Sequence, residues 1–385
     1  MDLKFPPPLS QQTFLQQYWQ KRPLLMRNAL TDYDFPLSAD ELAGLACEDE
    51  VESRIVREHS RHQWSLQHGP FSEADFAALG DSHWTLLVQD TDKYVPQIAE
   101  LLRRFHFIPS WRFDDIMISY ATPQGSVGPH TDTYDVFLIQ AQGRREWRID
   151  TRVANPALLP DLPVRILAEF EAENSWLLEP GDVLYLPPGV AHWGIAQDEC
   201  MTWSVGLRAP SASEMIDSFA QYLLEQASES GHYQDPPFNP PSSPAYIDSA
   251  VIRQNGRLLD EPWLDPALRR QWFGGFVTEI KPHLVIEPAA EAVSSELVQK
   301  RLATGRRLQR HPYARFAWTE LDDSRLALFV CGQHYPVASS LEPEIIRLCD
   351  ALHIDIHRNA ALQDNRFMDI LSELINQGFL EWLDD

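Results

Sequence analysis

Two stretches, GSVGPHTDTYDVFLIQ (residues 125–140) and EPGDVLYLPPGVAHWG (residues 179–194), decide the fold class and the chemistry of this chain. Side chains alternate between the two faces of a strand, so His130 and Asp132 should point the same way. The second stretch contains a strand-like run, DVLYLP, that ends in a Pro-Pro-Gly turn before His192. We therefore expect a barrel in which His130, Asp132 and His192 converge from distant strands.

Two imidazoles and one carboxylate make the facial triad that suits non-haem Fe(II), because this ligand set leaves coordination positions open. An all-histidine set would suit zinc or another chemistry better. A His-x-Asp pair alone is weak evidence, because it occurs by chance in many chains. The strand-like surroundings and the downstream PGDVLYLPPGVAH motif make the prediction specific, and His130, Asp132 and His192 are the predicted catalytic metal ligands.

The region around these motifs is strand-like from about residue 110 to residue 208. Short apolar runs are separated by Gly, Pro and Asp, a pattern typical of an all-β sandwich or barrel. Gly143 is expected to form the turn of a hairpin between DVFLIQ and REWRID. Upstream, TFLQQYWQKRPLLM (13–26) predicts a helix that ends at Pro23 and is followed by a strand.

The chain changes character after Pro210. Apolar residues at helical spacing predict a helix over 213–228, a Pro-rich stretch (234–244) favours irregular chain, and DPALRRQWFGGF (265–276) predicts another helix. Residues 312–385 alternate short strands and helices, as a winged helix does. We predict three domains: a β-rich metal-binding domain (1–210), a helical segment (211–280) and a winged-helix-like domain (281–385).

Composition restricts the partners of the protein. The formal net charge of −24 over 385 residues repels phosphate backbones and argues against direct binding of nucleic acid, whereas it attracts a basic protein. Four scattered cysteines form no CxxC pair, which fits free thiols in a reducing compartment. We recognise neither a signal peptide nor a membrane-spanning run, and we expect a cytoplasmic location without membrane contact.

Several segments resemble a known family. QYWQKRPLLMRN (17–28), HTDTYDVFLIQ (130–140), GRREW (143–147) and EPGDVLYLPPGVAHWG (179–194) are similar to the JmjC-domain oxygenases of the cupin superfamily. Together with the helical middle segment and the winged-helix-like end, they resemble the bacterial ribosomal oxygenases, which hydroxylate an arginine of large-subunit ribosomal protein sixteen.

The resemblance implies a fold, an activity and partners. The fold would be a mainly β JmjC/cupin double-stranded β-helix barrel with flanking helices, then a helical dimerisation segment and a small α+β winged-helix-like domain. The activity would be that of an Fe(II)- and 2-oxoglutarate-dependent dioxygenase that uses O2 to hydroxylate C-3 of an arginine side chain. The substrate would be a basic protein of the large ribosomal subunit, and the enzyme would be a homodimer.

The cosubstrate should find a cation near the metal. The far carboxylate of 2-oxoglutarate suits the planar guanidinium of an arginine, which can bind it in a bidentate way. Arg145 opens the strand after Gly143, and the resemblance places a basic cosubstrate-binding residue there. Gln140, on the strand expected to pair with it, is a second candidate contact.

A cationic substrate needs carboxylates and polar groups near the metal. The resemblance points to an acid before the His-x-Asp strand, a tyrosine just after it and a serine on the strand after the last histidine. Asp114 or Asp115, Tyr134 and Ser204 fit these descriptions, and the sequence does not distinguish between the two aspartates.

Other functions stay open at this point. The hydroxylated residue could be histidine instead of arginine. A metal-dependent cupin enzyme acting on a small molecule is a second alternative, although such cupins usually show His-x-His with an additional Glu. A non-enzymatic acidic scaffold is a third, although nothing structural requires two histidines and an aspartate to converge.

Overall fold

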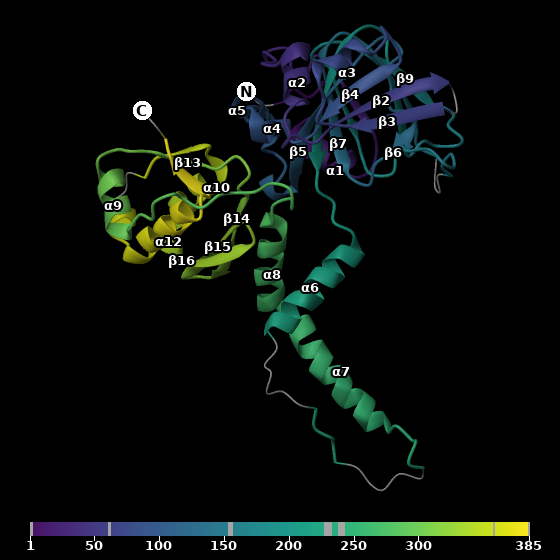
Figure 1. Ribbon diagram of the computed structural model, residues 1–385. Coiled ribbons are helices and arrows are strands. Elements are labelled where there is room, and N and C mark those ends of the chain that lie inside the picture. The colour runs from purple at the N-terminus through teal and green to yellow at the C-terminus, as the bar shows by residue number, and fades with distance from the viewer. Residues whose placement is uncertain are drawn as a thin grey trace. The chain divides into compact units, whose positions relative to one another are not determined.

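The computed structural model describes residues 3–60, 63–152, 157–226, 233–237, 243–356 and 359–383. The chain forms two compact units, Met1–Ala209 and Pro210–Asp385 (Figure 1). The helices of the predicted segment 211–280 lie within the second unit, and a separate boundary at residue 280 remains a prediction. Within the described ranges, no helix combines the length and the apolar composition that a membrane span requires.

Two sheets form the first unit, as expected for a JmjC/cupin barrel (Figure 1). They face each other through a shared apolar cluster that includes Leu138, Trp147 and Leu184. The larger sheet has the order β1 (Leu24–Met26), β10 (Val183–Leu186), β7 (Asp135–Gln142), β12 (Cys200–Leu207), β5 (Phe113–Ala121), β4 (Trp84–Val88), β2 (Ser53–Ser60) and β3 (Gln63–His68). The smaller sheet has the order β6 (His130–Thr131), β11 (Ala191–Ala196), β8 (Arg145–Asp150) and β9 (Asn174–Leu178).

The predicted hairpin between DVFLIQ and REWRID is wrong. Gly143 does turn the chain with a φ of 62°, but β7 pairs with β10 and β12, whereas β8 pairs with β9 and β11. The turn therefore carries the chain from one sheet to the other. A Cβ at residue 143 would lie 2.2 Å from the Glu199 carbonyl oxygen, which explains the need for glycine there.

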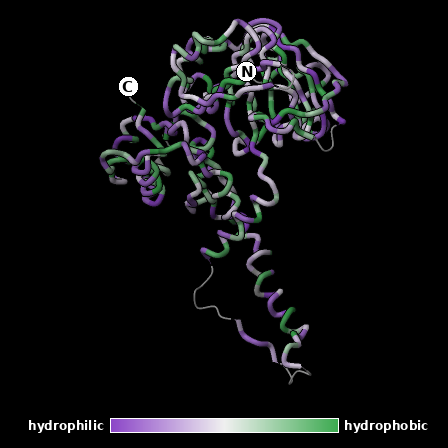
Figure 2. The backbone as a smooth tube through the Cα atoms, turned by 45° about the vertical axis from the view of Figure 1, so that its right-hand side comes forward, coloured by the Kyte–Doolittle hydropathy of each residue, from purple (hydrophilic) through white to green (hydrophobic). Residues whose placement is uncertain are grey.

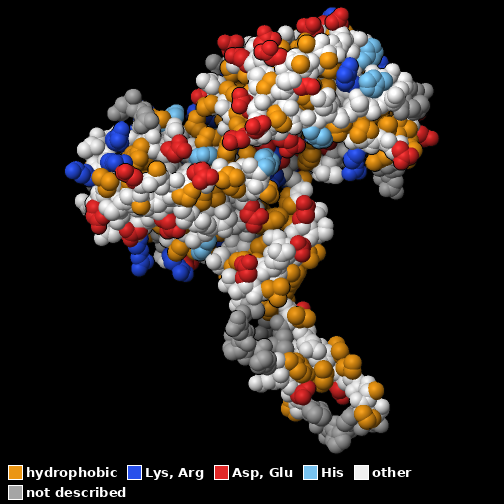
Figure 3. Space-filling view, in the orientation of Figure 1, with side chains coloured by type: hydrophobic (Ala, Val, Ile, Leu, Met, Phe, Trp, Pro, Cys, Tyr) orange, Lys and Arg blue, Asp and Glu red, His pale blue; other side chains and the backbone are white. Residues whose placement is uncertain are grey.

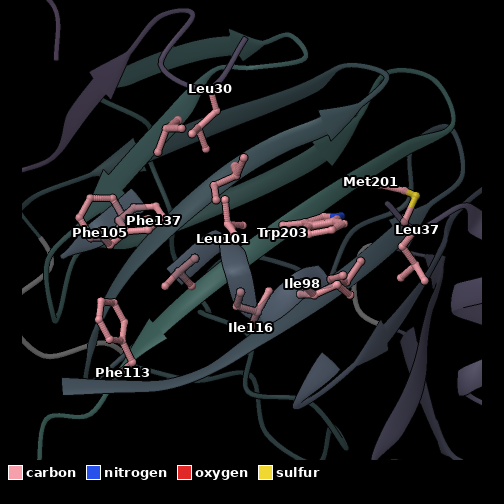
Figure 4. Close-up of a cluster of buried hydrophobic side chains, with 14 of the residues drawn as sticks. Leu30, Leu37, Ile98, Leu101, Phe105, Phe113, Ile116, Phe137, Met201 and Trp203 are labelled. Atoms are coloured by element: carbon pink, nitrogen blue, oxygen red, sulfur yellow. The ribbon is translucent and has the colours of Figure 1, made fainter. Parts of the chain in front are cut away.

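Alternation along β7 and β12 separates a core from the barrel interior. Phe137 and Trp203 point to the outer face, where they are fully buried against Ile98, Leu101 and Phe105 (Figure 4). These last three residues come from the helical segments α5 (Pro96–Ala99) and η1 (Glu100–Phe105). The intervening residues of both strands face inward and provide the interior of the site.

The N-terminal segment covers the same outer face. Helix α1 (Gln11–Gln17) begins where the Ser10 hydroxyl accepts the Thr13 N–H, and its Phe14 is fully buried. The prediction that Pro23 ends this helix is wrong, because the helix ends at Gln17. Gln20 adopts a left-handed conformation (φ 55°) before β1, and the remaining helical segments are α2 (Ala39–Leu45), α3 (Glu73–Ala77), α4 (Thr91–Tyr94) and η2 (Ser110–Arg112).

The second unit begins with three helices, α6 (Ala212–Gln226), α7 (Ser249–Leu264) and α8 (Pro266–Thr278). A winged-helix-like body with its own apolar core follows. Its elements are α9 (Ser295–Ala303), β13 (Leu308–Arg310), β14 (Phe316–Asp322), β15 (Arg325–Val330), β16 (Gln333–Ala338), η3 (Ser339–Leu341), α10 (Glu342–Asp350), β17 (His353–Ile354), α11 (Asn359–Leu362), α12 (Asn365–Asn376) and β18 (Leu380–Trp382).

Candidate metal centre and cosubstrate pocket

The three predicted metal ligands lie together. His130 and His192 are directly opposite each other on the paired strands β6 and β11, and their ring centroids are 4.2 Å apart. Asp132 follows β6, and its Oδ2 lies 3.5 Å from His192 Nε2 and 4.0 Å from His130 Nε2. One ligand atom from each residue lies within 4.8 Å of the other two, close enough for a single ion to contact all three.

The hydrogen bonds of both imidazoles favour metal binding. Nδ1 of His130 is 2.9 Å from the Gly128 carbonyl oxygen, and Nδ1 of His192 is 2.9 Å from the Val190 carbonyl oxygen. A carbonyl only accepts, so each Nδ1 carries the proton and each Nε2 presents its lone pair to the shared space. Burial, with a further contribution from His130, lowers the pKa of His192 to about 4, which keeps this imidazole neutral.

A buried cation lies in the same barrel. Arg145 is 3% exposed, and its Nη1 donates to Ser119 Oγ (3.2 Å) and Thr202 Oγ1 (3.4 Å). Its Nε has no hydrogen-bond partner, and no carboxylate among the described side chains pairs with it. Burial lowers the pKa of this guanidinium. A buried, unpaired guanidinium is costly, so the pocket is suited to an anionic ligand.

Comparison with known proteins assigns this arrangement to a family. Residues 100–215 match a JmjC domain, and residues 255–381 match a ROXA-like winged helix. The chain is 36% identical over 366 residues to the Escherichia coli ribosomal protein uL16 3-hydroxylase, covering 95% of this chain and 96% of that protein. The chain belongs to the JmjC-type ribosomal oxygenases.

Further relatives agree with this assignment. A probable ribosomal oxygenase of Haemophilus influenzae is 38% identical over 228 residues, which cover 59% of this chain and 56% of that protein. The crystal structure of E. coli YcfD covers both chains completely with a TM-score of 0.88 and 34% identity. A second structure of YcfD, described as a ribosomal oxygenase in complex with cobalt and 2-oxoglutarate, has a TM-score of 0.85.

Gln140 lies beside the Arg145 pocket of this oxygenase, but not on a paired strand as predicted. It is fully buried on β7, and its Oε1 accepts the hydroxyl of Thr202, which also contacts Arg145. Its amide group donates to the carbonyl oxygens of Gln142 and Gly143. Gln140 therefore reaches the guanidinium through Thr202 across the barrel interior, and a direct contact with cosubstrate remains a prediction.

The two candidate aspartates lie at an irregularity between β5 and β12, where a β-bulge changes the register. Asp115 is 5% exposed and accepts hydrogen bonds from the Asp90 N–H (3.1 Å) and Gln89 Nε2 (3.3 Å). A Cβ at Gly206 would lie 3.2 Å from Asp115 Oδ1, which places this carboxylate on the inward face. Asp114 is half-buried. Bulges often re-aim side chains next to active sites.

Ser204 and Tyr134 are the other two candidate substrate contacts. Ser204 is 7% exposed on β12, two residues beyond Thr202, and therefore shares its inward face. Tyr134 follows the metal-ligand strand and is 39% exposed. Burial, then the negative charges of Asp132 and Asp115, raise the pKa of its hydroxyl, which keeps the phenol protonated. Their contacts with a substrate remain predictions.

Three residues that the sequence did not single out complete the pocket. Ser119 and Thr202 hold the guanidinium of Arg145, and they are opposite each other in the pairing of β5 with β12. Gly194 leaves room for it, because a Cβ there would lie 2.8 Å from Arg145 Nε and from the Trp147 ring. Of the three, only Gly194 could have been found from the sequence pattern, because it lies two residues after His192 and therefore on the same strand face.

Proposed function

We propose that this chain is an Fe(II)- and 2-oxoglutarate-dependent protein hydroxylase whose substrate is an arginine side chain, at C-3, of ribosomal protein uL16. The observation that carries the proposal is the cluster of His130, Asp132 and His192, in which each Nδ1 bonds a backbone carbonyl and each Nε2 is left for a metal. The same barrel contains a buried arginine whose Nε has no hydrogen-bond partner. The relative named uL16 3-hydroxylase, which matches 95% of this chain, supports the substrate.

The residues present fit both groups that this chemistry needs. His130, Asp132 and His192 are a donor set that Fe(II) accepts with open positions. Arg145 would pair with the far carboxylate of 2-oxoglutarate, and Ser119 and Thr202 hold the guanidinium in place for it. When bound, iron and 2-oxoglutarate supply the oxidation of an unactivated C–H bond by O2, with release of succinate and CO2. The protein's share is to select that bond by positioning it.

Acidic and polar groups favour a cationic side chain at the mouth of the barrel. Asp114 and Asp115 both contribute negative potential at Tyr134, and Ser204 lies on the inward face. A carboxylate can hold a guanidinium by paired, directional hydrogen bonds, which fixes the carbon that faces the metal. The net charge of −24 should also speed encounter with a basic ribosomal protein, so association should weaken as salt rises. A ribosomal substrate would place the reaction in the cytoplasm.

Hydroxylation of histidine is the second candidate. Relatives named bifunctional lysine-specific demethylase and histidyl-hydroxylase match this chain, for example that of Culex quinquefasciatus at 25% identity over 56% of the chain. The higher identity and the fuller coverage of the uL16 3-hydroxylase favour arginine.

The test uses the full-length enzyme with Fe(II), 2-oxoglutarate and uL16 peptides in which the arginine is kept or replaced by lysine. We expect mass spectrometry to show one added oxygen on the arginine peptide alone, with an equal amount of succinate formed. Asp132→Ala should abolish both products. Turnover of a histidine peptide with no change to the arginine peptide would refute the arginine assignment and retain the oxygenase.

The aspartates have their own test. Asp115→Asn should reduce hydroxylation of the arginine peptide by at least tenfold while uncoupled formation of succinate from 2-oxoglutarate persists, because the carboxylate would hold substrate and not cosubstrate. Asp114→Asn is the matched comparison. If Asp114→Asn alone uncouples the reaction, the half-buried carboxylate holds the substrate.

We also infer that the helices after residue 210 form a homodimer interface. Apolar residues recur along α7 between hydrophilic ones (Figure 2), and hydrophobic side chains lie exposed along this part of the surface (Figure 3). On α6 and α7 the most exposed are Ile216 (55%), Leu224 (74%), Ile252 (59%), Leu259 (71%) and Leu264 (61%). A second copy would cover them in the manner of a two-fold, self-complementary interface.

A further inference from the structure

The strand that carries His130 is very short and makes few pairing contacts. β6 contains only His130 and Thr131, which pair with His192 and Ala191 of β11. Further upstream the backbone contacts β11 again, where Gln124 N–H donates to the Ala196 carbonyl (2.8 Å). Between these two points, residues 126–129 lie outside the strand ladder. The orientation of His130 therefore depends on how this short segment is held.

A chain of hydrogen bonds holds this segment. The indole N–H of Trp193 donates to Ser126 Oγ (2.8 Å), and the Gly128 N–H donates to the same oxygen (3.0 Å). The Gly128 carbonyl then accepts the Nδ1 proton of His130 (2.9 Å). Ser126 is 1% exposed, so water does not compete for its oxygen. Gly128 adopts a φ of 79°, which turns its peptide into this arrangement.

We propose that Ser126 is a positioning residue for the metal ligand His130 and that Trp193 braces it. Ser126 holds the Gly128 peptide, and the Gly128 carbonyl keeps the imidazole in the tautomer that presents Nε2. Trp193 follows His192 on β11, so its bond to Ser126 ties the segment before one ligand to the strand of the other. The inference deepens the proposed function and rests on it for the identity of the metal centre.

The second histidine provides an internal comparison. Nδ1 of His192 donates to the Val190 carbonyl, two residues earlier and directly after the Pro-Pro-Gly turn, and no side chain within the described ranges hydrogen-bonds the Val190 peptide as Ser126 does that of Gly128. His192 is also 2% exposed, whereas His130 is half-buried. Loss of the Ser126 hydroxyl should therefore affect His130 and leave His192 unchanged.

The ring of Trp193 is itself held in place. The Arg148 guanidinium lies 5.4 Å from its centroid, and Phe170 meets it edge-on at 6.1 Å. These contacts restrict the rotation of the indole, whose N–H donates to Ser126. Successive residues of a strand face opposite ways, so Trp193 points away from the side of β11 that carries His192 and contacts the segment before His130 instead.

The first experiment measures imidazole tautomers in the metal-free, full-length protein by nitrogen-15 NMR at mildly alkaline pH. In wild type and in Ser126→Thr, which keeps the hydroxyl, both His130 and His192 should carry the proton on Nδ1. In Ser126→Ala, His130 should become a mixture of tautomers while His192 stays unchanged. An unaltered His130 in a folded Ser126→Ala variant would overturn the proposal. Resonances are assigned with His130→Gln and His192→Gln.

The second experiment measures the affinity of the same proteins for Co(II) by absorption titration. Ser126→Ala and Trp193→Phe should weaken binding by about tenfold, as loss of an outer hydrogen-bond partner typically does, and Ser126→Thr should restore it. Trp84→Phe is the control, because its indole N–H donates to the Gly80 carbonyl and belongs to another strand. Equal affinities in all variants would overturn the proposal.

The two hypotheses fail in different ways. If wild type hydroxylates no uL16 peptide, the proposed function fails, while the tautomer and Co(II) comparisons still decide the role of Ser126. If hydroxylation occurs and Ser126→Ala leaves the tautomer of His130 unchanged, only the positioning role fails.

Discussion

At the scale of single residues, the chemistry of the site depends on groups that are unfavourable without their ligands. Arg145 is a buried cation without a carboxylate partner among the described residues, and both imidazoles direct Nδ1 to a backbone carbonyl, which leaves Nε2 for a metal. Such an arrangement contributes little to folding and is best understood as preparation for an anion and a cation that bind together.

Arg145→Met should therefore have opposite effects on binding and on stability. The apparent KM for 2-oxoglutarate should rise on the order of a hundredfold, since a lost buried charge pair costs about 2–5 kcal/mol. Without cosubstrate, the thermal unfolding temperature should rise, because the variant removes an unpaired buried charge. Arg144→Met, which removes an exposed guanidinium bonded to Asp198, is the control for both measurements. An unchanged KM would show that another residue holds the far carboxylate.

The buried imidazole of His192 predicts a pH dependence of stability. Its pKa is about 4 in the folded protein, below the ordinary value of 6.5, so the unfolded chain takes up a proton before the folded one does. The unfolding free energy is therefore unaffected by this group above pH 6.5. It falls by up to about 3 kcal/mol as the pH drops toward 4, because protonation stabilises the unfolded chain. Denaturant titrations of metal-free protein at pH 7 and pH 5 should show a smaller loss in His192→Gln than in wild type. His106→Gln, an exposed histidine, should behave as wild type.

The residues that the sequence could predict are those with a chemical signature. His130, Asp132 and His192 were recognisable from strand alternation and a distant histidine after a turn. Arg145 was a candidate from the charge that a dicarboxylate needs and from the resemblance to the JmjC oxygenases, and its contact with cosubstrate stays a prediction. Ser119, Thr202 and Ser126 were not, because a buried serine or threonine has no signature in sequence. Their roles depend on which strands meet across the barrel, and the mistaken hairpin shows that this pairing could not be read from the strand pattern.

At the scale of elements, the turn between β10 and β11 links the two ligand segments. Gly189 has a φ of 80°, and its N–H donates to the Asp132 carbonyl oxygen (2.8 Å). Gly189→Ala meets no atom within 4 Å, so its cost is backbone strain of about 1–2 kcal/mol. We expect Co(II) affinity to fall together with stability, because relief of the strain moves the Asp132 segment.

A matched variant separates these two effects. Gly305 also has a positive φ (87°) and open space, but it lies after α9 in the other unit. Gly305→Ala should lower stability by a similar amount without altering Co(II) affinity. Equal affinities for both alanine variants would contradict a role for the Gly189 turn in holding Asp132.

Elements were predictable where periodicity was strong. The β-rich region and the helices α6 and α8 were identified from apolar spacing, whereas α7 and the strands β2 to β4 were not predicted. β2 to β4 extend the larger sheet beyond the barrel, and β2 places an adjacent apolar pair, Ile55 and Val56, among charged residues, so it gave no clear alternation. The helix before Pro23 ended early because Gln20 turns to donate its side-chain amide to Asp135, a tertiary contact that local pattern does not reveal.

At the scale of the whole molecule, the proposed dimer makes a prediction about assembly. Ile252 and Leu259 are seven residues apart and share one face of α7. The double variant Ile252→Glu/Leu259→Glu should convert a dimer to a monomer in sedimentation or light scattering, because it places charges in an apolar interface. Arg253→Glu, on the same helix, should stay dimeric. A double variant with the mass of wild type would place the interface elsewhere.

The two sheets of the barrel carry different sets of the proposed site residues, and this has an evolutionary consequence. Both histidines and Arg145 are anchored on the smaller sheet, whereas Ser204 and the two candidate aspartates lie on β12 and β5 of the larger one. Under the proposed function, substitutions at these three positions, as distinct from Ser119 and Thr202 on the same strands, would change the substrate contacts while the metal ligands and the Arg145 pocket stay intact. A lineage with this architecture can acquire new targets without passing through an inactive ancestor.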